Sequence, residues 1–155
     1  MKRRWLSISY LLLCVTCLAM PMFFASGVDD TKVLKDLREL IAKVRTMSGP
    51  SMARTNGAEV IYQLTKNIDP KKVDDKTLKD LISLLDTPDR SVRDWVVGAL
   101  GCLGPRAKIA VPALLRVIRE TETDCQKIAT GPSSADAARV ALRRIGVEPP
   151  PSDCK

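Results

Sequence analysis

The 155-residue sequence predicts an all-α fold, and three observations support this prediction. Apolar residues recur at steps of three and four residues along most of the chain, which is the spacing of one helix face. No stretch alternates between apolar and polar residues with period two, as a half-buried strand would. Leu, Ala, Val and Ile dominate the apolar content and aromatic residues make up only 4% of the chain, which suits helices packed through aliphatic side chains.

The N-terminal segment has the order of a secretory signal peptide. Three basic residues at positions 2–4 precede a nearly uncharged apolar run over 5–24, and a cluster of small residues follows. Ala25 and Gly27 meet the preference for small residues near a cleavage site, which predicts a cut after Gly27. The alternative is an uncleaved membrane anchor, because a run of about 20 apolar residues can span a bilayer. Pro21 and the small-residue end favour cleavage, and hence an exported protein that is periplasmic or secreted.

Removal of the predicted signal peptide, residues 1–27, lowers the net charge. It takes away three of the 25 basic residues and leaves 22 against 18 acidic ones, a net charge of +4. The remaining sequence has no clustered basic stripe with stacking aromatic residues, which argues against a nucleic-acid partner. About 128 residues remain, enough for one domain with a single core.

Residues 28–70 predict a first pair of helices. Apolar residues at three- and four-residue steps predict a helix over 31–47, which Ser48-Gly49-Pro50 stops. Ser51 has the side chain of an N-cap for a second helix over 52–66. This pair matches the following ones only in helix length and periodicity, so we interpret it as a divergent N-terminal capping pair.

Residues 71–105 predict a second pair. Its first helix begins at Asp75, and the turn Thr87-Pro88-Asp89 ends it. Its second helix carries an apolar stripe that runs from Val92 to Leu103. The glycine that follows is expected to form a left-handed C-terminal cap.

Residues 106–146 predict a third pair with an enlarged loop between its helices, over 120–133. Its first helix spans about 111–120, with Pro112 in the first turn, where no N–H bond is needed. Its second helix follows Ser133 and Asp136, which have the spacing of a capping box, and ends at Gly146. The tail over 147–155 is Pro-rich and therefore expected to be extended.

The second and third pairs repeat each other. Residues 81–85 (LISLL) superimpose on 114–118 (LLRVI) at an offset of 33. Residues 99–104 (ALGCLG) superimpose on 141–146 (ALRRIG) at an offset of 42. The two offsets differ by nine residues, which places the enlargement of the third pair between its own two helices.

The stretch LISLLDTPDRSVRDWVVGALGCLGPRAKIAVPALLRVI resembles HEAT repeats of the bacterial phycobilin-lyase-like subtype. The matching features are the LxxLL-type first helix, the Pro-Asp turn, ALGxLG at the close of the second helix and AVPALL at the start of the next repeat. The resemblance covers about residues 78–118, with a weaker continuation through DAARVALRRIG. It implies a short α-solenoid of about three antiparallel helix pairs, whose second helices line a concave side that holds other proteins.

The residue types argue against the commonest enzyme designs. Histidine is absent, which excludes Ser-His and Cys-His nucleophile pairs and all His-containing metal sites. The glycines of GALGCLG, at 98, 101 and 104, lie opposite the apolar stripe or at a helix end, whereas phosphates bind helix N-termini. We therefore expect no catalytic residues, no metal and no cofactor.

Two features are candidates for partner binding. Trp95 lies at the border of the apolar stripe with Cys102 seven residues on, and serves either as an exposed aromatic anchor or as filling for the seam between repeats. Arg139, Arg143 and Arg144 form the most basic part of the chain together with the arginines of the preceding helix. They predict a contact for an acidic protein or an anionic envelope component, or else a solvated end face.

Three cysteines remain after signal cleavage removes Cys14 and Cys17. An extended tail reaches about 28 Å, further than the roughly 18 Å length of the last helix, so Cys154 can reach Cys125 in the enlarged loop. A Cys125–Cys154 disulfide is our first prediction for an oxidising compartment. Pairing of Cys102 with Cys154 is the main alternative, and free thiols or an intermolecular bridge remain open.

These features together predict an exported, non-enzymatic scaffold or adaptor that holds a protein partner in the bacterial envelope. No nucleic acid, and no membrane after signal cleavage, is expected as a partner. Two alternatives remain. One is a chromophore handler, which the resemblance to phycobilin lyases suggests, and the other is a membrane-tethered spacer with an uncleaved signal.

Overall fold

The computed structural model describes residues 29–49, 51–122 and 133–152, and these residues contain helices but no strand. The α-helices are α2 (Asp30–Thr46), α3 (Met52–Asn67), α4 (Asp75–Ser83), α5 (Arg90–Cys102), α6 (Val111–Thr121) and α7 (Ser134–Ile145). Short 3-10 segments connect or extend them: η2 (Pro70–Lys72), η3 (Leu84–Asp86) and η4 (Gly104–Ala110). The all-α prediction is confirmed. The predicted signal peptide, most of the enlarged loop and the end of the tail lie outside the described residues.

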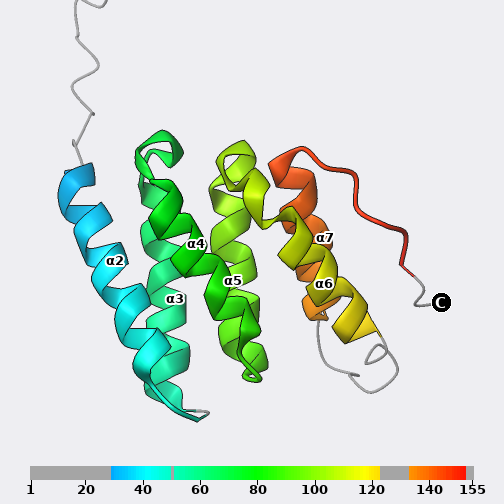
Figure 1. Ribbon diagram of the computed structural model, residues 1–155, viewed down its shortest axis with the longest axis horizontal. Helices are drawn as coiled ribbons and strands as arrows, with labels where there is room; N and C mark the ends of the chain where they lie inside the picture. Colours follow the sequence, from blue (N-terminus) through cyan, green and yellow to red (C-terminus); the bar gives the residue numbers. More distant parts are fainter. Residues whose placement is uncertain (1–28, 50, 123–132, 153–155) are drawn as a thin grey trace, which may run out of the picture.

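The helices form two layers (Figure 1). α2, α4 and α6 lie side by side in one layer, and α3, α5 and α7 lie behind them in the other. Consecutive helices run antiparallel and pack as the pairs α2–α3, α4–α5 and α6–α7. The most extensive contacts between pairs join α5 to α3 and to α7. The second helices therefore hold the row of pairs together.

A continuous apolar core lies between the two layers, and every pair contributes to it. The largest fully buried side chains include Leu37, Ile61, Leu78, Leu100, Leu114 and Leu142. Full burial of such a side chain stabilises the fold by about 1.5–3 kcal/mol. Most of the positions predicted from the three- and four-residue steps are buried or partly buried in this core, but Val60 of α3 is exposed.

Side chains at the helix starts satisfy free backbone N–H groups. Asp29, Ser51, Asp74 and Asp89 each accept such a bond at the start of α2, α3, α4 and α5. The predicted capping box at the start of α7 is present in full. Gly104 and Gly146 adopt the left-handed conformation with φ of 54° and 91°, as their predicted capping roles require.

The glycines within α5 are contact points with the neighbouring helices. A Cβ atom at Gly98 would lie 3.2 Å from the ring of Tyr62 on α3. A Cβ atom at Gly101 would lie 3.2 Å from the Cα atom of Ala141 on α7. The side of α5 opposite its apolar stripe is thus also packed, because a missing Cβ atom allows α3 and α7 to approach closely.

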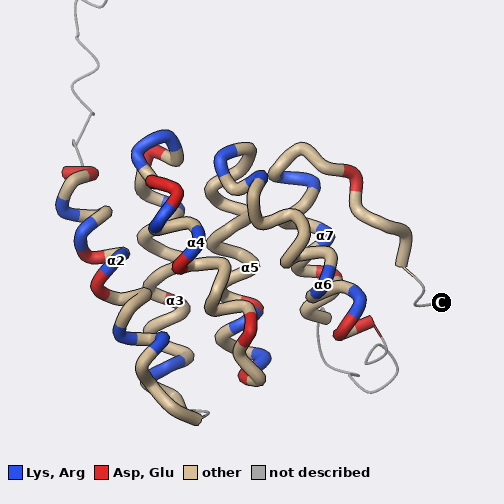
Figure 2. The backbone as a smooth tube through the Cα atoms, viewed as in Figure 1, with Lys and Arg blue, Asp and Glu red and all other residues tan. Residues whose placement is uncertain are grey.

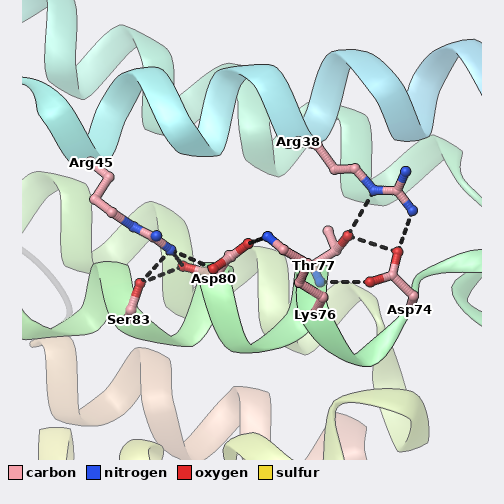
Figure 3. A network of polar contacts seen from close by, with 7 residues as sticks. All are labelled: Arg38, Arg45, Asp74, Lys76, Thr77, Asp80 and Ser83. Atoms are coloured by element: carbon pink, nitrogen blue, oxygen red, sulfur yellow. Dashed lines mark hydrogen bonds and ion pairs between the residues drawn. The ribbon is translucent and has the colours of Figure 1, made fainter.

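In the layer formed by α2, α4 and α6, polar contacts join α2 to α4 (Figure 3). Arg38 donates hydrogen bonds to Asp74 and, at 3.1 Å, to the Thr77 hydroxyl. Arg45 binds the Asp80 carboxylate at 2.8 Å and the Ser83 hydroxyl at 2.9 Å. These bonds attach the N-terminal pair, which the sequence marks as divergent, to the pair that follows it.

This network predicts a loss of stability in acid. The backbone N–H of Thr77 and the Arg38 guanidinium lower the pKa of Asp74 below its ordinary value of 3.8. Lys76 and Arg45 lower the pKa of Asp80 in the same way. A carboxylate with a lowered pKa in the folded state stabilises the fold above its unfolded pKa, and that stabilisation is lost as the pH falls further. We expect the midpoint temperature of thermal unfolding to decrease once the pH is lowered below about 4. Circular dichroism measures this midpoint.

The control for this prediction is Asp74→Asn, which keeps an N-cap side chain but has no charge to titrate. Its thermal midpoint should depend less steeply on pH between about pH 4 and pH 2. Equal slopes for the variant and the wild type would show that Asp74 does not contribute.

Candidate interaction surface

The outer side of the α3–α5–α7 layer carries Trp95 and Arg144, two of the four residues that the sequence marks for partner binding. We call it the α3–α5–α7 face and define it by Tyr62, Lys66, Trp95, Cys102, Val140 and Arg144. Each of these residues is at least partly exposed. Most of the buried apolar residues of the same helices belong to the continuous core.

Trp95 occupies the seam between α5 and α3. Its ring centroid lies 5.3 Å from that of Tyr62, with the two ring planes tilted by 44°. Both rings pack against the core and remain partly exposed. The Nζ atom of Lys66 lies 5.6 Å from the Tyr62 ring centroid, within cation–π range. Trp95 therefore fills the seam, as one of its two interpretations holds, and still presents an aromatic edge.

Sequence reasoning did not identify Tyr62. Its ring covers Gly98 of α5, a residue 36 positions further along the chain. The signal in the sequence is a tyrosine outside the apolar stripe of its helix, combined with a glycine in the second helix of the following pair. That signal has meaning only once α3 and α5 are known to be neighbours.

Arg143 and Arg144 are exposed on α7. The Cδ atom of Arg144 lies 3.6 Å from the position of a Cβ atom on Gly101, so its side chain follows the boundary between α7 and α5. Neither residue forms an ion pair with another described residue. Both guanidinium groups are therefore available to a partner.

Arg139 differs from these two residues because it is buried, with 4% of its surface exposed. Its Nε atom donates to the carbonyl of Pro150 at 3.1 Å, and its Nη2 atom donates to that of Pro151 at 3.2 Å. The same Nη2 atom binds the carboxylate of Glu122, at the end of α6. Because the tail covers its guanidinium, Arg139 holds the chain's own segments together and does not belong to an exposed basic patch.

The predicted Cys125–Cys154 disulfide falls on residues outside the described ranges. The described residues on either side of it are informative, because Glu122 and Pro151 bind one nitrogen of Arg139. Each stands three positions before a cysteine, and three residues of chain span at most about 11 Å. Cys102 is a partly buried free thiol. The Cys125–Cys154 disulfide stays a prediction, with Cys102–Cys154 as the alternative.

Peptide mapping of the unreduced protein tests this pairing. We expect one linked pair of peptides that contains Cys125 and Cys154, and a Cys102 peptide that alkylates without reduction. A linked pair that contains Cys102 and Cys154 would contradict the prediction.

Comparisons of the chain with protein-family models, with curated proteins and with solved structures find no match. Among the helices that the structure describes, none has the length and apolar character needed to cross a bilayer. The described ranges also contain no cluster of three or more Cys, Asp or Glu side chains with the geometry of a metal site.

Proposed function

We propose that the protein is an exported, non-enzymatic repeat protein whose α3–α5–α7 face holds a protein partner in the bacterial envelope. In this proposal the three helix pairs are a short α-solenoid of the HEAT type. The predicted signal peptide supports export and hence the envelope location, and the resemblance of residues 78–118 to bacterial HEAT repeats supports the architecture.

The contacts between helix pairs support the solenoid. Extensive contacts join each second helix to the next, from α3 to α5 to α7. Polar side chains connect successive pairs as well: Arg106 binds Asp75 at 2.6 Å, and Ser134 of α7 binds Asp94 of α5. Stacking of similar units on their nearest neighbours is the organisation of repeat proteins.

The observation that carries the proposal is the partly exposed pair of Tyr62 and Trp95. Aromatic residues that are anchored on one side and accessible on the other are the usual centres of protein interfaces. Lys66 on one side and Arg144 on the other add positive charge to the same face. The proposed partner therefore presents an apolar side chain within an acidic segment. The helices are already folded, which keeps the ordering cost of binding low.

Affinity capture from envelope extracts tests this proposal, followed by titration of the captured partner. We expect Trp95→Ala to weaken binding at least about tenfold, or about 1.4 kcal/mol, and the double charge reversal Arg143→Glu/Arg144→Glu to weaken it as well. Ile109→Ala is the matched control, because Ile109 is 47% exposed and lies in η4, outside this face. Wild-type recovery of the same partners by both face variants would reject the α3–α5–α7 face as the binding site.

Three further measurements separate this proposal from its alternatives. A visible absorbance band in the purified protein, or rapid titration of the Cys102 thiol, would favour a chromophore handler. N-terminal sequencing of the exported protein decides between a cleaved signal and a membrane tether. A start at Val28 rejects the tether.

A further inference from the structure

The two ends of the row of helix pairs are covered differently. At the C-terminal end, the tail runs along α7 (Figure 1), and Arg139 binds the carbonyls of Pro150 and Pro151. Pro149 is buried in this contact and Val147 packs against the core. At the N-terminal end, no described segment covers the outer side of α2 and α3. That side therefore exposes the surface on which a preceding helix pair would pack.

A groove between α2 and α3 opens on this uncovered side, and we call it the end groove. It has a volume of about 350 Å³ and is lined by Asp36, Glu39, Leu40, Lys43, Val60 and Leu64. Its floor is apolar, and 48% of the Val60 surface is exposed. Arg38 of α2 and Tyr62 of α3 contact the next pair and lie away from the groove. The end groove thus faces away from the rest of the molecule.

The charged residues of the end groove complement a second copy of the same groove. Asp36 stands four residues before Leu40 on α2, and Lys43 stands three residues after it. Neither side chain forms an ion pair with a described residue. When two α2 helices cross antiparallel with Leu40 at the centre, Lys43 of each copy meets Asp36 and Glu39 of the other. Basic and acidic residues are interspersed along α2 (Figure 2).

We infer that the end groove binds a second copy of this chain. The two α2 helices lie antiparallel about a two-fold axis at Leu40, and the Leu40 side chain of each copy enters the groove of the other between Val60 and Leu64. Such an interface is isologous, so one contact covers both exposed grooves and closes the assembly at a dimer. This inference goes beyond the proposed function, because the α3–α5–α7 face stays open in both copies.

Analytical ultracentrifugation of the exported protein, purified without reductant, tests the dimer. We expect a concentration-dependent equilibrium between monomer and dimer, and Val60→Glu should raise its dissociation constant at least about tenfold, since it places a charge in the apolar floor. Ile109→Glu is the matched control, because Ile109 is 47% exposed in η4 and lies outside both the end groove and the α3–α5–α7 face. A monomer at all concentrations, or a dimer that Val60→Glu leaves unchanged, overturns the inference.

A charge exchange tests the antiparallel register. Asp36→Lys and Lys43→Glu should each weaken the dimer, because like charges then face each other across the axis. The double variant Asp36→Lys/Lys43→Glu should recover part of the affinity, since positions 36 and 43 again carry opposite charges, while Glu39 still opposes the new acidic residue. Failure of the double variant to recover affinity overturns the proposed pairing at Leu40. Partner capture through Trp95 is measured separately, so either proposal can fail without the other.

Discussion

Replacement of Arg139 by alanine is expected to lower the free energy of unfolding by about 3 kcal/mol, and the thermal midpoint by about 10 °C. The Arg139 guanidinium is buried and binds three acceptors: the Glu122 carboxylate and the carbonyls of Pro150 and Pro151. Its removal takes the buried cation away from the Glu122 carboxylate and releases the tail from α7. Chemical denaturation of the two proteins measures the difference.

Arg143→Ala provides the control for this experiment. Arg143 is exposed on the same helix, so its removal should change stability by no more than about 0.5 kcal/mol. A double-mutant cycle with Glu122→Gln isolates the contribution of the Arg139–Glu122 ion pair to the free energy of unfolding. Equal stability losses for the variants at Arg139 and Arg143 would show that the buried contact does not stabilise the fold.

Replacement of Gly101 by leucine is expected to destabilise the protein by about 3 kcal/mol, the upper part of the range for an overpacked contact. A Cβ atom at this position already lies 3.2 Å from the Cα atom of Ala141, and backbone atoms have little freedom to move. The added side chain must therefore push α7 away from α5. The higher helix propensity of leucine offsets only part of this cost.

The second-site change Ala141→Gly should restore part of the stability lost in Gly101→Leu, because it opens space at the contact. Ser91→Leu is the control on the same helix, since Ser91 is exposed and is not among the buried residues of α5. Thermal unfolding of the wild type, the two single variants, the double variant and Ser91→Leu measures the clash and its relief. If Ala141→Gly lowers stability equally in both backgrounds, the clash between α5 and α7 is not the cause.

The helices and their ends were predictable because their determinants are close together in the sequence. The capping box of Ser133 and Asp136 spans three residues, and the structure confirms both of its hydrogen bonds. The buried stripe of α5 follows directly from the spacing of its apolar residues. Local periodicity and caps of this kind act within about one helical turn, so they can be recognised without knowledge of the fold.

The roles of Trp95 and Arg139 could not be decided in the same way. Trp95 had two interpretations, and the choice between them depended on Tyr62, which lies 33 residues earlier in the chain. Arg139 was grouped with Arg143 and Arg144 because all three are basic residues of one helix. Its burial results from Glu122 and from the tail, which approach α7 from two other parts of the chain.

The sequence by itself determined that this protein is helical, where its helices begin and end, and which side of each helix is apolar. It also predicts a signal peptide and repeated helix pairs. Only the tertiary structure decided which polar side chains are accessible, because accessibility depends on partners 10 to 40 residues away along the chain. In the folded protein the tail covers one end of the row of helix pairs, and the end groove lies at the other end. The physical reason is that backbone conformation follows from neighbouring residues, whereas the surface left to a partner is what remains after distant segments have packed.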